Sequence, residues 1–486
     1  MSGKKFYSDV LFVQVINILV KALWILAIDR AVQNLLPPES YGRYFSLLAF
    51  SILFIILLDL GINNMNSREV ARDRSFFYKN FYGILRAKLL FSLLYLGVMF
   101  VAFFALGFGA EDLNIMLPLA LMQIIISFNT YLRTNIAAHE RFKLDGIFAV
   151  LDRTIVIVLG GALLVVPTWT DWLTIERFVY IQVVGVGVSF IGLLAVNMRL
   201  RAEVSQPSRF QISFIKELLR KTLPFALLAA LMSLYTRIDA VMIKDMLGDG
   251  QADRYAMGYR LLDALNMIAV LLSGILLPMF SARIQDHKQI RKLSSMGMRV
   301  LVLPSIVLVC LGVIYGPEIM YLMYPAKADI ETAEAFSVLL ACFLPISVVY
   351  IYGTLLTANR SLRFLNMLAG FSVVFNLILN LYLIPEYDIL GAAWATLFTQ
   401  SLFAMGCLFN AQRRLEALPD KKEWLRWAGF VLTVWLLSFG TLQFLDNSPV
   451  HIAILIIGSL FAALAFRLIS KDLLGLFSSK SDGSRG

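Results

Sequence analysis

The chain has 486 residues, of which 59% are hydrophobic and only 16% are charged. Soluble globular domains usually carry about 25% charged residues, so this composition excludes an ordinary soluble protein. The formal net charge of +10 would fit a nucleic-acid partner, but its distribution along the chain favours another explanation.

Apolar runs of about 20 residues, each long enough to cross a ~30 Å hydrocarbon core as a helix, recur from end to end. They predict an all-α polytopic membrane protein with 14 transmembrane helices. The predicted spans are residues 10–34, 45–66, 80–106, 114–138, 144–167, 177–198, 222–246, 255–281, 299–323, 333–357, 364–385, 390–411, 424–445 and 450–469.

Lys and Arg gather in the N-terminal segment, in every second loop and in the C-terminal tail. The alternate loops are acidic and include Glu111, Asp112, Asp245, Asp249 and Asp253. This bias predicts that both termini are cytoplasmic. It assigns the basic charge to membrane topology and anionic lipid headgroups, and we expect no nucleic-acid partner.

An internal repeat divides the chain. Ile28-Asp29, Leu36 and Tyr44 recur about 210 residues later as Ile238-Asp239, Leu247 and Tyr255. Each copy reads as a helix ending near Ile-Asp, a short turn and a second helix, which is the pattern of a duplicated transporter. We therefore predict two six-helix lobes related by a pseudo-twofold axis. The predicted parts are an N-lobe (1–200), a C-lobe (201–415), an appended helix pair (416–471) and a cytoplasmic tail (472–486).

The first predicted helix has a polar face formed by Gln14, Asn17 and Lys21. A lysine at the bilayer centre costs about 3 kcal/mol or more, so this face must contact protein or water. Asp29 is rotated off the face. Two interpretations stay open: a face that lines a cavity, or a Lys–Asp pair that holds helices together.

The second predicted helix ends at Leu58-Asp59-Leu60-Gly61, where Asp59 is expected to pair with Arg68 or Arg72. Asp152 also needs a partner, and the residues around it can be structural or contact a substrate. Four cations of helices three to five have long stems that can reach the cytoplasmic headgroups: Arg86, Lys88, Arg133 and Arg153.

The seventh and eighth predicted helices carry further charges. Arg237 has no acid on its own helical face, whereas Asp239 lies on the opposite one. Arg260 and Asp263 are three residues apart and can form an ion pair, with Tyr259 and Asn266 beside Asp263. The surplus of cations over acids in helices one, seven and eight predicts an anionic cargo.

The sequence lacks the common motifs of nucleotide binding, zinc-dependent hydrolysis and serine hydrolysis. No GxxxxGK[ST], HExxH or GxSxG occurs, and the three histidines are far apart. We therefore predict no catalysis, metal or resident cofactor, and expect turnover to draw on an ion gradient or the membrane potential. Asn376 and Asn380 are expected to bond across helices.

Three stretches resemble the polysaccharide, O-antigen-type flippases of the multidrug/oligosaccharidyl-lipid/polysaccharide exporter (MOP) superfamily. The first is Leu36-Pro-Pro-Glu-Ser-Tyr-Gly-Arg-Tyr44, and the second joins Leu223-Pro224 and Ile238-Asp239 to Tyr255 and Tyr259-Arg260-Leu261. The third runs from Asn376-Leu-Ile-Leu-Asn380 through Ile384-Pro385 to Gly391-Ala392-Ala393. Asp388 stands where this last signature often has Gly.

The resemblance implies a polyprenyl-pyrophosphate-linked glycan as cargo, moved to the outer leaflet of a bacterial inner membrane by rocking of two lobes. It implies three roles for residues of this chain, and partners that include membrane lipids, a polysaccharide polymerase and chain-length machinery. The expected phosphate or acidic-sugar contacts are Lys21, Arg237 and Arg260, with Arg30 and Arg153 as weaker candidates. The expected sugar contacts are Gln14, Asn17, Tyr259 and Asn266, and the candidates for a coupling proton or sodium ion are Asp29, Asp239 and Asp263.

Two other functions compete with this one. A drug or metabolite exporter of the same superfamily would handle cationic cargo and would need an excess of acids in its cavity. A membrane-embedded glycan polymerase or ligase would need a large outer loop with paired catalytic residues. The longest outer connection here, residues 316–332, is short for that purpose.

Overall fold

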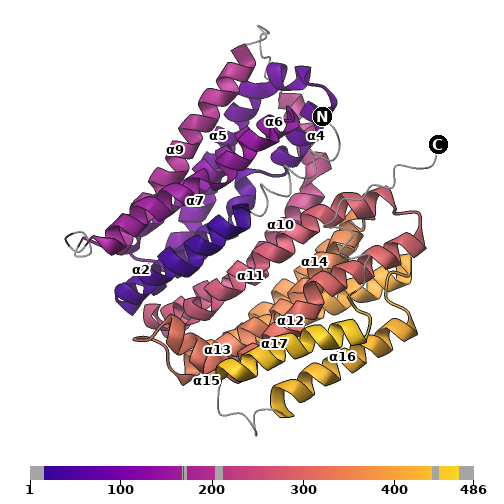
Figure 1. The fold of residues 1–486 in the computed structure, drawn as a ribbon. Coiled ribbons are helices and arrows are strands. Elements are labelled where there is room, and N and C mark those ends of the chain that lie inside the picture. The colour runs from indigo at the N-terminus through magenta and orange to yellow at the C-terminus, as the bar shows by residue number, and fades with distance from the viewer. Residues whose placement is uncertain (1–15, 167, 169–171, 203–211, 441–447, 470–486) are drawn as a thin grey trace. The chain divides into compact units, whose positions relative to one another are not determined.

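The computed structural model describes residues 16–166, 168, 172–202, 212–440 and 448–469 (Figure 1). Throughout these ranges the regular structure is helical and contains no strand. This is expected in hydrocarbon, because a spanning helix satisfies its own backbone polar groups. Residues 16–23 lead into the first labelled helix. The elements are η1 (Trp24–Asp29), α2 (Arg30–Leu35), α3 (Pro38–Leu53), η2 (Ile55–Leu58), α4 (Ile62–Arg72), α5 (Ser75–Ala105), η3 (Ala110–Asp112), α6 (Leu113–Ala138), α7 (Phe142–Val165), α9 (Ile175–Ala202), α10 (Ile212–Leu247), α11 (Asp249–Ala282), α12 (His287–Met323), α13 (Ile330–Ala341), α14 (Phe343–Ala358), α15 (Leu362–Leu415), α16 (Lys421–Gly440) and α17 (Ser448–Ala465).

The helices agree with the predicted spans, and the protein is an all-α polytopic membrane protein. Nine of the described helices are long and apolar enough to cross a membrane. One of them, α15, contains two predicted spans, which meet at Tyr387 and Asp388, where the backbone leaves the helical conformation. Asp388 has a φ of +49°, in the left-handed region that favours glycine.

Two boundaries differ from the prediction. The second helix does not end at Gly61. It is interrupted after Leu53 and continues as α4 to Arg72. The seventh and eighth helices are joined by Gly248 alone, at a φ of +92°. Arg254 and Tyr255 therefore lie inside α11 and do not open it.

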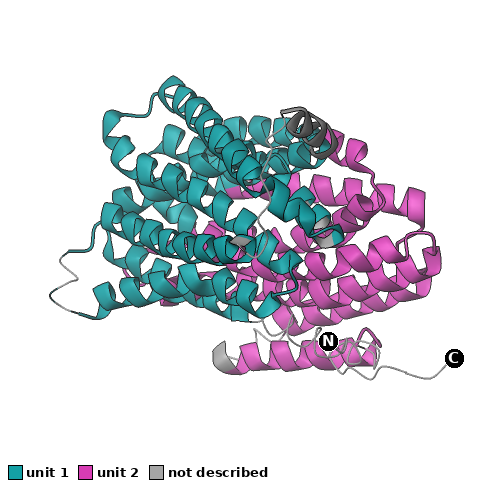
Figure 2. Cartoon of the chain, turned by 90° about the horizontal axis from the view of Figure 1, so that it is seen from above, with its two compact units in different colours: residues 1–257, 369–392 teal, residues 258–368, 393–486 magenta. Residues whose placement is uncertain are grey.

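The chain divides into two compact units (Figure 2). Unit 1 contains residues 1–257 and 369–392, and unit 2 contains residues 258–368 and 393–486. Both α11 and α15 contribute to each unit. The lobe boundary at residue 200 stays a prediction, and the tail 472–486 lies outside the described residues.

Unit 1 is built around α6, which packs against α9, and α7 also packs against α9. A core of large side chains joins α5, α6 and α9 and includes Phe77, Phe81 and Tyr131. Buried amides cross this core: Asn66 donates to Asn135, and Asn135 donates to Asn197. Hydrogen bonds of this kind help membrane helices to associate, because the hydrophobic effect does not drive helices together inside a lipid bilayer.

In unit 2, α12 packs against α13 and α14, and α16 pairs with α17. The Ser305 and Ser347 hydroxyls, 2.9 Å apart, link α12 to α14. Tyr315 and His451, both buried, hydrogen-bond between α12 and α17. Within unit 2, the pair α16 and α17 is therefore held to α12 by a polar contact as well as by packing.

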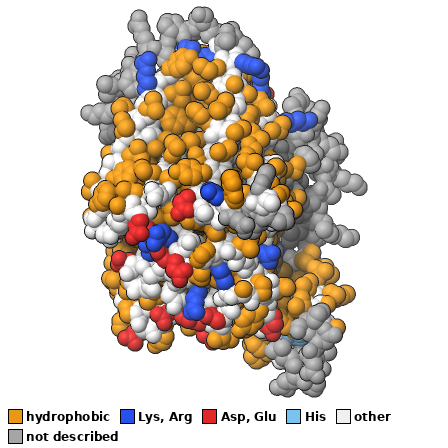
Figure 3. Space-filling model, turned by 90° about the vertical axis from the view of Figure 1, so that its left-hand side faces the viewer, with side chains coloured by type: hydrophobic (Ala, Val, Ile, Leu, Met, Phe, Trp, Pro, Cys, Tyr) orange, Lys and Arg blue, Asp and Glu red, His pale blue; other side chains and the backbone are white. Residues whose placement is uncertain are grey.

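Large apolar side chains are exposed along the outer helices, as lipid contact requires. Examples are Val101 in α5, 72% exposed, and Ile191 in α9, 68% exposed. The face drawn in Figure 3 has a broad hydrophobic surface; acidic side chains gather in the lower half of the view, and basic side chains lie both there and along the upper edge. Contiguous apolar surface of this extent is unusual on a soluble protein.

The two copies of the repeat contact each other directly within unit 1. A Cβ built on Gly42 in α3 would lie 1.7 Å from the carbonyl oxygen of Asp249 and 2.7 Å from the nitrogen of Asp253. Only glycine permits this approach of two helix backbones. Ser46, one turn further, donates to the carbonyl of Ala240 in α10 at 3.0 Å. The segment Tyr41-Gly42-Arg43-Tyr44 of the first copy lies inside α3, and helix packing therefore explains its glycine.

We predict that Gly42→Ala separates α3 from the start of α11 and lowers the free energy of unfolding by about 2 kcal/mol or more, because backbone atoms cannot move aside cheaply. Thermal unfolding of the purified protein in detergent measures the effect. Gly97→Ala in α5, which meets no atom within 4 Å, is the matched control and should be neutral or slightly stabilising. Equal behaviour of the two variants would contradict the packing argument.

Candidate functional site

A cluster of charges surrounds the first helix in unit 1. Lys21 lies within electrostatic range of Arg133, Asp152 and Arg153, and Asp145 pairs with Arg133. We call Lys21, Arg133, Asp145, Asp152 and Arg153 the Lys21 cluster. It joins the first helix to α6 and α7, and it holds one more cation than carboxylates.

The other members of the Lys21 cluster compensate one another in part. Arg133 makes two bonds to Asp145, at 2.7 and 3.2 Å. This bidentate geometry is among the strongest between side chains. Arg153 lies 3.7 Å from its neighbour Asp152. Lys21, by contrast, makes no ion pair with any residue that the structure describes.

Aromatic rings border the cluster. The guanidinium of Arg153 lies 5.4 Å from the centre of the Trp24 ring, and Trp24 stacks on Phe178 at 5.5 Å. Trp24 opens η1, a π-helical turn that ends at Asp29. Such turns displace side chains from the regular α-helical register and often occur at functional sites.

The remaining predicted cargo contacts fall into both units. Asn17, Arg30 and Arg237 lie in unit 1 and are half-buried. Unit 2 holds Tyr259, which is buried, and the half-buried Arg260 and Asn266. Gln14 lies outside the described residues. Within unit 1 the structure brings Lys21 and Arg153 together, and the roles of all these residues stay predictions.

Two of the predicted ion-coupling acids are buried. Asp29 is 1% exposed and accepts a hydrogen bond from the Tyr41 hydroxyl at 2.9 Å. Asp239 is fully buried and accepts one from the Tyr255 hydroxyl. Both copies of the repeat therefore place an acid near the end of one helix against a tyrosine of the next. Asp263 is half-buried in unit 2.

The structure bears on several expectations for the first half. Asp59 pairs with Lys88 at 3.3 Å and not with Arg72, whereas the Arg68 side chain lies outside the described part of the chain. Lys88 does not extend to the headgroups, because its side chain is fully buried. Arg133 bonds Asp145 and Arg86 is exposed, and the reach of both stems to the headgroups stays a prediction. For Lys88 the better partner is a carboxylate close in space but 29 residues away in sequence.

In α15, the Asn380 amide donates to Asn376 one turn earlier at 3.0 Å. Both side chains are fully buried. This bond runs along the helix, and the bonds across helices stay a prediction.

A second group of charges was not singled out from the sequence. Arg43 in α3 lies 3.2 Å from Asp249 and 3.5 Å from Asp112. Lys244 in α10 lies 3.2 Å from Asp112 and 3.5 Å from Asp249. We call these four residues the Arg43 ring. Each cation is shared by two carboxylates, and the ring connects the turn between α10 and α11 to the start of α3 and to η3.

A further bond lies beside the Arg43 ring. Gln33 donates to the Asp253 carboxylate at 2.8 Å and to its carbonyl at 3.0 Å. One signal in the sequence could have revealed the ring. Arg43 and Lys244 are two cations that lie in or beside loops whose other charges are mostly acidic.

Comparison with solved structures shows which fold the chain shares. The chain is similar to the lipid II flippase MurJ in an inward closed conformation, with a TM-score of 0.67 and 14% identity over 97% of this chain and 100% of that one. An inward-facing multidrug resistance MATE family transporter gives a TM-score of 0.64 and 16% identity, covering 84% and 98%. A MOP superfamily transporter from Pyrococcus furiosus gives 0.61 and 16%, covering 86% and 97%. The chain therefore has the fold of the MOP superfamily.

Residues 9–285, more than half of the chain, match the family of polysaccharide biosynthesis proteins. The chain belongs to this family, which confirms the resemblance carried by its motifs. It is also 30% identical over 200 residues to an uncharacterized membrane protein of Methanocaldococcus jannaschii. That match covers 40% of this chain and 46% of the relative, so the chain spans about half of the relative's length.

We predict that Arg43→Ala and Asp249→Ala each lower the free energy of unfolding by about 1 kcal/mol, and that the double variant costs less than the sum of the two. Chemical unfolding in detergent would measure the coupling. Glu111→Gln is the control, because Glu111 is 78% exposed and 4.0 Å from Arg43, and it should change stability little. Strict additivity of Arg43→Ala and Asp249→Ala would show that the ring stores no coupling energy.

Proposed function

We propose that the protein is a flippase for an anionic polyprenyl-pyrophosphate-linked oligosaccharide, such as an O-antigen, capsule or exopolysaccharide repeat unit. It would move this lipid from the cytoplasmic to the outer leaflet of the cytoplasmic membrane, with both termini on the cytoplasmic side. The observation that carries the proposal is the surplus cation of the Lys21 cluster inside an apolar helical unit. A pyrophosphate would supply the charge that this site lacks.

The family supports this substrate class, because its members are described as polysaccharide biosynthesis proteins. The fold supports the reaction, because one structure that shares it is described as a lipid II flippase. We propose no catalytic role and no resident cofactor. A polysaccharide polymerase with its chain-length machinery would act on the translocated product.

In this proposal the cations of helices one, five, seven and eight hold the phosphate oxygens. Lys21 and Arg153 would act from the Lys21 cluster, with Arg237 and Arg260 on later helices and Arg30 as a weaker contributor. Lys offers a compact charge and Arg a planar pair of donors. Gln14, Asn17, Tyr259 and Asn266 would hydrogen-bond the sugars.

Alternating access gives the Arg43 ring a role. On the topology that we predict, the ring lies on the outer side, where it joins the two copies of the repeat. Release of cargo to the outer leaflet would require these copies to separate, and therefore the ring to break. Contacts of moderate strength suit this purpose, because partly exposed ion pairs contribute only about 0–1 kcal/mol each.

Asp29, Asp239 and Asp263 are our candidates for the group that binds a coupling proton or sodium ion. The support is the burial of Asp29 and Asp239, since an ionised carboxylate in an apolar interior is costly unless a proton or a cation neutralises it. We predict that Asp239→Asn abolishes the response of transport to an imposed ion gradient in proteoliposomes, while Asp286→Asn in an exposed loop leaves it intact. An unchanged response of Asp239→Asn would remove this residue from the coupling step.

The test of the function is leaflet-resolved lipid analysis in the native host. We expect depletion of the protein to make a polyprenyl-linked glycan accumulate on the cytoplasmic face, where an impermeant outer-face enzyme cannot reach it. Accumulation that the enzyme can reach would point to a later polymerase or ligase step. No accumulation would favour a drug or metabolite exporter of the same superfamily.

The same assay tests the site. Lys21→Ala, Arg153→Ala, Arg237→Ala and Arg260→Ala should each slow flipping about tenfold or more at normal protein levels, because a hydrogen bond to a charged group contributes about 1.5–3 kcal/mol. Arg86→Ala, which removes an exposed cation of α5, is the matched control. Normal transport by all four site variants would contradict the anionic site.

A further inference from the structure

The second helix is interrupted between α3 and α4. After α3 ends at Leu53, the chain makes the single turn η2, and Leu60 and Gly61 then take φ values of +45° and +86° before α4 begins at Ile62. An interruption of this kind leaves carbonyl groups without a helical N–H partner. Inside an apolar bundle such groups must be satisfied by other parts of the protein.

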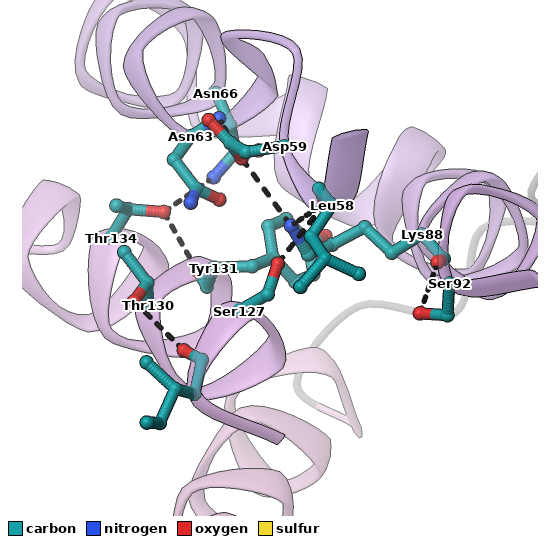
Figure 4. Close-up of polar contacts among 11 residues, drawn as sticks. Leu58, Asp59, Asn63, Asn66, Lys88, Ser92, Ser127, Thr130, Tyr131 and Thr134 are labelled. Atoms are coloured by element: carbon teal, nitrogen blue, oxygen red, sulfur yellow. Dashed lines mark hydrogen bonds and ion pairs between the residues drawn. The ribbon is translucent and has the colours of Figure 1, made fainter. Parts of the chain in front are cut away.

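A lysine from another helix fills this gap (Figure 4). The Lys88 ammonium group, on α5, donates to the Leu58 carbonyl at 3.1 Å and to the Asp59 carboxylate at 3.3 Å. Ser127 of α6 donates to the same carbonyl at 3.0 Å. The Lys88 side chain has no exposed surface. We call Lys88, the Leu58 carbonyl, Asp59 and Ser127 the Lys88 clamp.

The clamp also starts the next helix. The Asp59 carboxylate that faces Lys88 accepts a hydrogen bond from the backbone N–H of Asn63 at 3.2 Å. One turn further, Asn66 of α4 donates to Thr134 and Asn135 of α6. The position of α4 is thus fixed against α5 and α6 by polar contacts that do not involve α3.

The chemistry around the ammonium group is that of a cation site. A carbonyl at the end of a helical turn and a carboxylate are the oxygen ligands with which interrupted membrane helices bind small cations. The negative end of the helical dipole adds to their attraction. Here the cation is the ammonium group of Lys88, which belongs to the chain itself.

We propose that the Lys88 clamp is a monocation site occupied by the protein's own lysine, and that truncation of Lys88 opens it to a small primary alkylammonium ion. Lys88 acts as a positioning residue. It holds the start of α4, which packs against α10 as well as α6, and so sets the placement of a half-helix between these two helices. The proposal concerns the chain's own frame and does not depend on the cargo.

The first experiment is chemical rescue of purified Lys88→Ala, measured as the midpoint of thermal unfolding in detergent. We expect the midpoint to fall by about 5 °C or more and to rise saturably with millimolar propylammonium chloride, which replaces the deleted atoms. Tetramethylammonium chloride at equal concentration controls for salt. Lys88→Met fills the space without charge and should show no such rise. A rise of equal size in Lys88→Met or in the unaltered protein would overturn the proposal.

The second experiment stays informative where Lys88→Ala does not fold. Asp59→Asn leaves a buried ammonium group without its carboxylate, which is worse than removing both charges. We expect a lower unfolding midpoint for Asp59→Asn than for the double variant Asp59→Asn/Lys88→Met. The reverse order would show that the pair does not hold the break. Both experiments measure unfolding, so they can succeed when the flippase assay fails, and the two proposals are distinguishable.

Discussion

The structure depends on one constraint, which is that an ionised side chain among apolar helices must find a compensating charge or dipole. In unit 1 this constraint is met mostly inside the protein. Lys88 donates to the Asp59 carboxylate and to the Leu58 carbonyl, which also accepts a hydrogen bond from Ser127. Asp145 binds Arg133 through two bonds. Such pairs add modestly to stability, because desolvation offsets much of their attraction. Their effect is to fix which helices meet and in what register.

Close packing supplies the second part of the frame, and it depends on the repeat. Gly42 lets the start of α3 approach the start of α11 to backbone contact. The Arg43 ring then closes over this contact with charges from α3, α10, α11 and η3. Backbone approach brings these short-range ion pairs within reach, so the glycine and the ring form one arrangement. A transporter that separates the two copies must disrupt both.

Sequence reasoning predicted the helical class, most spans and the family, because these follow from the length and periodicity of apolar runs and from short motifs. It also singled out Lys21 and Arg153, which lie in one cluster. It missed the partner of Asp59, because Lys88 is 29 residues away and on another helix, and helical periodicity carries no information across helices. The break at Leu60 and Gly61 resembled a helix end for a related reason. A glycine after a turn signals that a helix stops, and only the packing of α4 on α6 shows that a second helix begins at once.

The two kinds of charged site differ in the degree of their compensation, and in our proposal this difference separates the structural frame from the cargo site. In the Lys88 clamp and the Arg43 ring every cation lies within 3.5 Å of a carboxylate oxygen of the described chain. An added anion would gain little there. In the Lys21 cluster the two acids pair with the two arginines, and Lys21 is repelled by both arginines and attracted by Asp152 alone. We propose that the remaining attraction acts on an entering anion, and that it is stronger among partly buried helices than it would be in water. A cargo whose phosphates must leave water during translocation needs such a site, whereas a cationic cargo would be repelled by it.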